Sequence, residues 1–174
     1  MLSSLGPVTT ERLQGRRPEE GDLPEYVRIF GDPRIDEATW PADLRTPDRV
    51  ADLLRRTIQH WDRWGFGAWT VLDRGSERIL GRVGLGYTSV LGHPEVELAW
   101  FIDPDVWNRG YATEMAAEAV RAAFTTLGLD TLISYTTPDN EASQTVMRKL
   151  GMIYETDVEN AGLPHVLYRL ARVT

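Results

Sequence analysis

The sequence predicts a single domain of the α+β (mixed α/β) class, with a mostly antiparallel sheet of about seven strands. Residues 95–102 alternate between two kinds of side chain with the period of two that a strand requires. Apolar residues recur at helical spacing in residues 23–30 and 47–64. A strand, a helix and a second strand then follow one another between residues 95 and 136, and a right-handed crossover of this kind makes its two strands parallel.

The composition excludes several classes of function. The 174 residues carry a formal charge of −7 and a pI near 5.0, which argues against a nucleic-acid-binding protein because such a protein needs a basic face. The absence of Cys excludes disulfides, a thiolate nucleophile and Cys-ligated zinc, and three scattered His residues argue against any metal site. No leader or membrane-length apolar run is visible, so we expect a cytoplasmic protein that binds no membrane.

The first elements follow from local signals. Residues 1–8 are expected to form a flexible tail, and residues 9–174 the single domain. A short strand begins at Thr10. Asp22 is expected to cap the helix over residues 23–30, because a carboxylate before an apolar helical stripe accepts hydrogen bonds from the first turn.

A longer helix and a hairpin come next. Thr46 is a helix cap, and Pro47 takes the first helical position, where its missing N–H costs nothing. The apolar stripe continues to Trp61, and Gly65-Phe66-Gly67 ends the helix. Residues 68–73 and 79–87 are then predicted as two strands joined by a tight turn.

The turn after the central strand is the most informative stretch. Asp103-Pro104 ends the strand, and residues 107–113, here called the phosphate turn, lead directly into an Ala-rich helix. The first amides of a helix have no partner within it and attract anions, especially phosphates. Gly110 and Ala112 are small, so a phosphate can approach the backbone closely.

The order of residues in this turn resembles a known family motif. Trp107-Asn108-Arg109-Gly110-Tyr111-Ala112 resembles motif A of the GCN5-related N-acetyltransferases (GNAT), which reads Gln/Arg-x-x-Gly-x-Gly/Ala and binds the pyrophosphate of acetyl-CoA. Trp107 departs from the pattern, but this removes a side chain and leaves the amides in place. The run Gly-Tyr-Ala-Thr-Glu is similar to the branch that includes the ribosomal-protein N-terminal acetyltransferases.

The resemblance implies a GNAT fold, in which a central parallel strand pair splays apart and helices cover both faces of the sheet. It also implies acetyl-CoA as cosubstrate. The implied contacts lie in the phosphate turn, at Asn108, Arg109, Gly110, Tyr111, Ala112 and Thr113, and on the central strand, at Trp100, Phe101 and Ile102.

A second run, residues 140–152, resembles the family segment that lies along the pantetheine arm of the cofactor. Asn140 and Ser143 stand at its cofactor-binding positions. The same residues also describe an ordinary capped helix that ends at a glycine. Residues 152–159 and 164–171 are predicted as a closing hairpin. Dimers are frequent in the family, so a homodimer is an open alternative.

Acetyl transfer to an amine requires a base for the ammonium. Glu97 is the first candidate, acting through water, because a carboxylate on a central strand is costly unless it has a partner or a chemical role. The alternative for Glu97 is a salt bridge with an Arg such as Arg82. Glu95 and His93 are the reserve bases.

The acid that protonates the departing thiolate is less well marked. The resemblance makes Ser143 the candidate, because Met147 stands where many members carry the usual Tyr. Ser143 is equally well explained as a serine on a helix surface. The chain segment between the first two helices lines the acceptor pocket in this family, which makes Trp40 and Phe66 candidate substrate contacts beside Glu97, with core packing as their alternative.

Two functions from different classes are therefore open. The first is an acetyl-CoA-dependent N-acetyltransferase that acts by direct transfer in a ternary complex. The second is a non-catalytic acyl-CoA-binding sensor or interaction module on the same fold. The sequence does not choose among a protein N-terminus and small amines as the acceptor.

Overall fold

The computed structural model describes residues 4–36 and 40–173. Within these residues one mixed sheet has the strand order β1-β2-β3-β4-β5-β6-β8-β7. The strands are β1 (Val8–Thr9), β2 (Leu13–Arg16), β3 (Ala68–Asp73), β4 (Ile79–Thr88), β5 (Glu95–Ile102), β6 (Thr131–Thr136), β7 (Ile153–Asn160) and β8 (Leu163–Ala171). The α-helices are α1 (Leu23–Phe30), α2 (Pro47–Trp64), α3 (Tyr111–Thr125) and α4 (Glu141–Lys149), and the short 3₁₀ turns are η1 (Glu20–Asp22), η2 (Ala42–Leu44) and η3 (Pro104–Val106).

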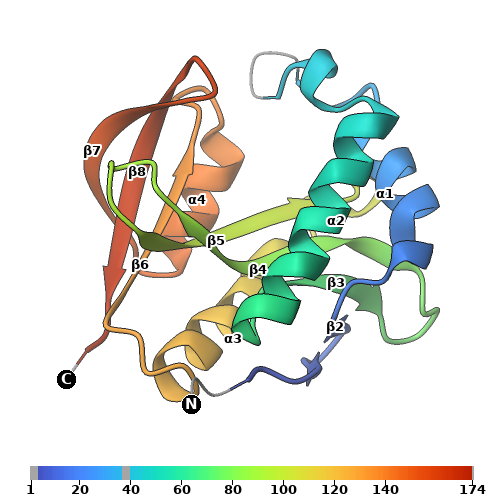
Figure 1. Cartoon of the computed structure of the whole chain (residues 1–174), viewed down its shortest axis with the longest axis horizontal. Helices are drawn as coiled ribbons and strands as arrows, with labels where there is room; N and C mark the ends of the chain where they lie inside the picture. Colours follow the sequence, from blue (N-terminus) through green and yellow to red (C-terminus); the bar gives the residue numbers. More distant parts are fainter. Residues whose placement is uncertain (1–3, 37–39, 174) are drawn as a thin grey trace.

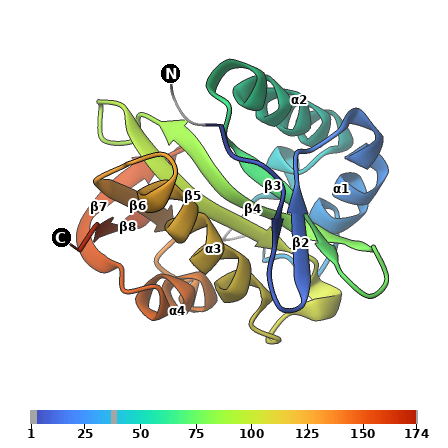
Figure 2. The ribbon, with the colours of Figure 1, turned by 90° about the horizontal axis from the view of Figure 1, so that it is seen from below.

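The helices cover both faces of the sheet. Figure 2 shows α1 and α2 on one face and α3 and α4 on the other. The small and apolar side chains of α3 pack on β5 and its neighbours in the largest core cluster, while Phe30 of α1 and Leu54 of α2 belong to a separate cluster on the opposite face. The predicted fold class is confirmed, with eight strands in place of seven.

The eighth strand lies in the segment expected to form a tail. Val8 and Thr9 pair with Gly15 and Gln14 of β2. Leu5 is buried in the core cluster, and its backbone N–H donates to the Gly65 carbonyl at 2.8 Å. The tail expected over residues 1–8 is therefore wrong for residues 4–8, because an apolar side chain in this segment finds a place in the core. Residues 1–3 lie outside the described residues.

The parallel pair is present, and it separates almost at once. β4 and β5 stay in antiparallel register from the Gly81–Ile102 pair to the Thr88–Glu95 pair. β5 and β6 are registered at one pair alone, Glu97 with Ile133. Figure 1 shows the two halves of the sheet diverging from this point. Past Glu97, the β6-facing edge of β5 has no registered strand partner among the described residues.

The helix ends match the sequence with one exception. The Thr46 hydroxyl accepts from the Arg49 amide at 3.4 Å, and Gly65 ends α2 in the left-handed conformation, with φ 73°. Asp22, however, makes no side-chain cap to α1. Its buried carboxylate accepts instead from Arg16 at 2.6 Å and from the Thr70 hydroxyl at 2.8 Å. A guanidinium stabilises a buried carboxylate more than a helix amide does.

Candidate active site

The phosphate turn opens α3 as the sequence predicts. Gly110 is the N-cap residue, with φ 78° and no side-chain cap. The first backbone amide of α3 that donates to a protein acceptor is that of Glu114, bonded to the Gly110 carbonyl at 2.9 Å. Within the described chain, the amides of Tyr111, Ala112 and Thr113 have no protein acceptor. These free donors and the positive end of the helix dipole form an anion site.

Side chains from the turn between β1 and β2 support the phosphate turn. Arg12 donates from Nη1 to the Arg109 carbonyl at 2.9 Å and from Nε to Glu114 Oε2 at 2.7 Å. Its guanidinium also lies over the Tyr111 ring, 4.6 Å from the centroid. The Thr10 hydroxyl donates to Glu114 Oε1 at 2.6 Å. The phosphate turn is therefore tied to the edge of the sheet through groups that leave the α3 amides free.

The approach to the turn is also held by side chains. Trp107, which replaces the Gln/Arg of the motif, donates from its indole Nε1 to the Ile102 carbonyl at 2.8 Å. The fully buried Asp103 accepts from both Arg28 and Arg78 at 2.7 Å. Trp107 thus has a structural contact with the end of β5, and the departure from the motif does not loosen the turn.

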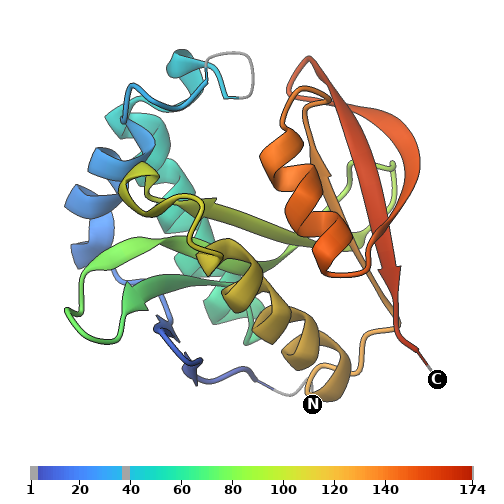
Figure 3. The ribbon, with the colours of Figure 1, turned by 180° about the vertical axis from the view of Figure 1, so that it is seen from behind.

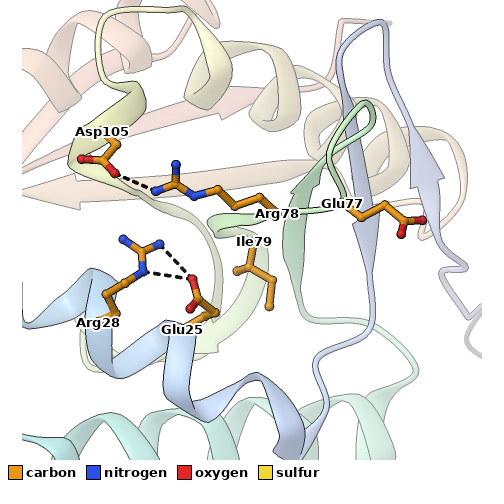
Figure 4. Close-up of a pocket in the computed structure, with 6 residues that line it drawn as sticks. All are labelled: Glu25, Arg28, Glu77, Arg78, Ile79 and Asp105. Atoms are coloured by element: carbon orange, nitrogen blue, oxygen red, sulfur yellow. Dashed lines mark hydrogen bonds and ion pairs between the residues drawn. The ribbon is translucent and has the colours of Figure 1, made fainter.

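The cavity shown in Figure 4 belongs to the same supporting network. It has a volume of about 570 Å³ and is lined by Glu25, Arg28, Glu77, Arg78, Ile79 and Asp105. Arg28 pairs with Glu25 at 2.9 Å, and Arg78 pairs with Asp105 at 2.7 Å. These ion pairs stabilise the η3 turn. Because the arginines already have carboxylate partners, the cavity is a poor site for an anion.

Glu97 lies on the opposite side of β5, facing the layer of α1 and α2. Burial raises the pKa of its carboxyl to about 7, although the positive charge of Arg82 and a hydrogen-bonding interaction with Tyr135 oppose the shift. Arg82 comes from β4 and Tyr135 from β6. We call these three residues, together with Gly86, the acceptor face; Gly86 pairs with Glu97, and a Cβ added to it would meet no atom within 4 Å.

Tyr135 is coupled to the same carboxylate. Burial, with the negative charge of Glu97, raises the pKa of the Tyr135 hydroxyl to about 12, so the phenol stays protonated at neutral pH. Its oxygen lies 3.2 Å from the Thr88 hydroxyl. A protonated phenol in this position can orient Glu97 and stabilise its charged form.

The other candidate bases have different surroundings. Glu95 forms an ion pair with Arg169 at 3.0 Å, and His93 Nδ1 is 3.7 Å from the same carboxylate. No ion pair within 4.0 Å joins Arg82 to Glu97 in the described chain. Of the three sequence candidates, Glu97 is therefore the one without a salt bridge in the described chain, and burial raises its pKa.

The second motif forms α4 and begins with a cap. Asn140 Oδ1 accepts from the Ser143 amide at 3.1 Å, and its Nδ2 donates to the Thr136 hydroxyl at 3.0 Å. The partly buried Ser143 hydroxyl has no hydrogen bond within residues 4–36 and 40–173. Met147 is buried in a small cluster with Met152 and Tyr168, where it packs as an ordinary core residue.

The two predicted acceptor contacts, Trp40 and Phe66, have different surroundings in the structure. Trp40 lines a cavity of about 330 Å³ between α2 and the tip of the β7–β8 hairpin. Phe66 is only 2% exposed, with its ring 5.0 Å from His60 and 5.4 Å from Tyr87, and it lies outside this cavity. The core alternative holds for Phe66, because its position after α2 turns the ring inward.

Two interactions at the candidate site were not predicted from the sequence. Arg12 supports the phosphate turn from about one hundred residues away in the chain, and Tyr135 of the neighbouring strand lowers the pKa of Glu97. The signal for Tyr135 was its place two residues beyond Ile133 on a strand expected to run beside β5. A polar aromatic residue in a mostly buried strand requires a partner.

Two features are absent from the part of the chain that the structure describes. No group of three or more His, Cys, Asp or Glu residues is placed to hold a metal ion. None of the helices described here is both long enough and apolar enough to cross a membrane.

Comparisons with known proteins agree with this geometry. A family model described as an acetyltransferase (GNAT) domain matches residues 12–153. The uncharacterized N-acetyltransferase YoaA of Bacillus subtilis is 29% identical over 144 residues, which cover 83% of this chain and 81% of YoaA. The crystal structure of an acetyltransferase from Agrobacterium tumefaciens superimposes with a TM-score of 0.82 at 26% identity, covering 99% of this chain and 98% of that one.

A more distant structure carries a ligand. The ribosomal L7/L12 alpha-N-protein acetyltransferase RimL, solved in complex with coenzyme A, superimposes with a TM-score of 0.78. The match covers 95% of this chain and 97% of RimL, at 12% identity. A likeness at this identity shows a shared fold.

Proposed function

Because the chain belongs to the acetyltransferase (GNAT) family, we propose that it moves the acetyl group of acetyl-CoA directly to a primary amine within a ternary complex. One observation carries the proposal. The gap between β5 and β6 opens beside Glu97, with the free amides of the phosphate turn on one face of the sheet and the acceptor face on the other. Donor and acceptor can then meet where the two strands separate.

The phosphate turn fits the pyrophosphate of acetyl-CoA. Three free amides and a helix start supply the attraction, and the Gly110 position is open, since a Cβ there would meet only the end of Arg12, 3.5 Å away. Arg109 is exposed and adds positive charge. The edge of β5 past Glu97 supports binding of the pantetheine through the backbone of Trp100 to Ile102, because that edge faces no registered strand.

Glu97 acts as the base in this proposal. An alkyl ammonium is not a nucleophile, so a proton must leave the nitrogen before it attacks the thioester carbonyl. A carboxylate whose pKa is about 7 accepts that proton, through water, more readily than an ordinary glutamate does. The N–C bond forms and the C–S bond breaks, and the attacking nitrogen loses its second proton as it becomes an amide. One of the two protons lost by the nitrogen balances the proton gained by the departing sulfur, and the other passes from Glu97 to solvent.

Ser143 supplies a proton or a hydrogen bond to the departing sulfur. Its hydroxyl is partly exposed and has no partner in the described chain, so it is available to a ligand lying along the start of α4. Asn140 already uses both amide atoms within the protein. We therefore propose that Asn140 mainly fixes the start of α4 and contacts the pantetheine through its remaining acceptor capacity.

The proposal is tested by measuring thiol release from acetyl-CoA with a panel of small amines and N-terminal peptides. We expect release that depends on the added amine and an acetylated product of the matching mass. Tight binding of acetyl-CoA with no release for any amine would instead support the non-catalytic acyl-CoA-binding alternative.

A further inference from the structure

The cavity beside Trp40 has a distinctive lining. Its walls are apolar and aromatic at Phe30, Trp40, Leu44, Val50, Leu53 and Ala161, and its polar lining residues are Arg49, Arg56 and Asn160. Arg49, Leu53 and Arg56 are spaced by four and three residues on α2, so they share one face of the helix. Among the described residues that line the cavity none is acidic, although the chain as a whole has a charge of −7.

The two arginines of this cavity have no counter-ion among the described residues. Neither Arg49 nor Arg56 forms an ion pair anywhere in residues 4–36 and 40–173. The contrast with the cavity of Figure 4 is direct, because Arg28 and Arg78 there are paired with carboxylates. A neighbour on α2, Arg55, is likewise paired, with Asp52 at 2.6 Å. Unpaired arginines at the mouth of an apolar cavity favour an anionic ligand.

A third cation lies deeper on the same face of the sheet. Arg82 is opposite Phe101 in the β4–β5 register, and its Nε is buried without a hydrogen-bond partner. Burial lowers the pKa of Arg82 and the positive charge of Arg56 lowers it further, while Tyr26 and the negative charge of Glu97 oppose the shift. Arg82 therefore adds a third, buried positive charge to this face of the sheet, between the two unpaired arginines and Glu97.

A row of side chains on β5 connects the cavity to the acceptor face. The Phe101 ring stacks on Phe30 at 4.1 Å and meets Trp40 edge-on at 5.0 Å. Ala99 and Glu97 follow Phe101 on the same face of β5, since side chains alternate along a strand. Opposite Glu97, Gly86 leaves open space. An acceptor seated at Trp40 can extend along these small residues towards Glu97.

We infer that the acceptor is a primary amine that also carries a carboxylate or phosphate, which Arg49 and Arg56 bind at the cavity while the amine extends to Glu97. An apolar or aromatic spacer between the two groups fits the walls at Phe30 and Trp40. This inference rests on the proposed acetyl transfer and adds the class of acceptor to it.

The test uses matched pairs of amines that differ in charge. The pairs are 4-(aminomethyl)benzoate with 4-(aminomethyl)benzamide, tyramine phosphate with tyramine, and 4-aminobutanoate with 4-aminobutanamide. We expect kcat/KM for thiol release to favour the anionic member of at least one pair by about tenfold to a hundredfold, the usual value of a charge-assisted hydrogen bond. The pair that responds tells whether the site prefers carboxylate or phosphate.

The arginine variants show where that preference arises. Arg49→Gln and Arg56→Gln should reduce kcat/KM for the anionic amine to near that of its neutral partner, and leave the neutral amine and acetyl-CoA binding unchanged. Arg55→Gln is the matched control, because Arg55 lies on the same helix outside the cavity, and it should keep the full preference. Equal turnover of charged and neutral amines by the wild-type enzyme, or equal loss for both in the variants, would overturn the inference.

A binding measurement separates this inference from the proposed function. Calorimetry with the three anionic probes, in the presence of CoA, should show tighter binding than with their neutral partners, and Arg56→Gln should abolish the difference. This result does not depend on turnover. Thiol release without charge preference would contradict the acceptor class alone, whereas anion binding without release for any amine would contradict the proposed reaction alone.

Discussion

The phosphate turn and the acceptor face lie on opposite sides of β5 and are built from different materials. The turn is one contiguous stretch whose functional groups are backbone amides, and side chains such as Arg12 only hold its shape. The acceptor face gathers side chains from three strands, and its chemistry depends on burial and on neighbouring charge. Substitutions in the turn should therefore matter when they block the backbone, whereas those on the acceptor face should matter through charge and protonation.

The largest effect is expected on the acceptor face. Glu97→Gln keeps the shape of the side chain and removes the base, so kcat at neutral pH should fall by roughly two to four powers of ten. Acetyl-CoA affinity should stay the same, because the carboxylate lies on the other side of the strand. Glu95→Gln, at a carboxylate already paired with Arg169, is the control for a general change of charge on β5. If Glu95→Gln lowers kcat as much, the base has been wrongly identified.

In the phosphate turn, Gly110→Glu should weaken acetyl-CoA binding by on the order of a hundredfold, since it places a carboxylate against phosphates at a cost of several kcal/mol. Gly110 has φ 78°, so part of the effect could come from backbone strain. Gly110→Asn separates the two causes, because Asn tolerates this conformation and carries no charge. Calorimetry with CoA showing equal affinity for wild type and Gly110→Glu would remove the turn from the binding site.

Ser143→Ala should have a smaller effect. A thiolate leaves readily even without a proton, so kcat should fall by about tenfold to a hundredfold while cofactor affinity is nearly unchanged. Thr145→Ala, on the same helix, is a suitable control for the loss of a hydroxyl. Loss of CoA affinity with kcat preserved would make Ser143 a binding residue.

The smallest effect is expected for Tyr135→Phe. The Tyr135 hydroxyl lowers the pKa of Glu97, so its removal should raise that pKa by a fraction of a unit to about one unit. The base must be ionised to act. The rate should therefore fall a few-fold at pH 7 and recover near pH 9, and the acidic limb of the profile should move to higher pH. Tyr154→Phe, at an exposed tyrosine of β7, should not move it.

The same contrast explains what the sequence could predict. The strand from Glu95 to Ile102, the helix start after Gly110 and the Asn140 cap are local patterns, and all three are present in the structure. The prediction of Asp22 as a helix cap is wrong because its carboxylate instead binds Arg16 of β2 and Thr70 of β3. Local patterns carry no information on which distant side chains will compete for such a carboxylate.

The candidate site likewise has a part that the sequence could predict and a part that it could not. The phosphate turn could be located from six consecutive residues, but Arg49 and Arg56, the two unpaired arginines of the cavity beside Trp40, could not be distinguished from Arg55 on the same helix. Their difference arises from which face of α2 turns towards the β7–β8 hairpin. Tyr135 was visible as a strand residue, and its approach to Glu97 depends on where β5 and β6 separate.

The central claim is that Glu97 is the base of an amine acetylation. The most direct test is the pH dependence of kcat/KM for wild type and Glu97→Gln with one responsive amine, corrected for the ionisation of that amine. In the wild type we expect an acidic limb with an apparent pKa near 7, because ionisation of the buried Glu97 carboxyl activates the enzyme. In the Glu97→Gln variant we expect no such limb. An acidic limb of the same position in a folded Glu97→Gln enzyme would contradict the account.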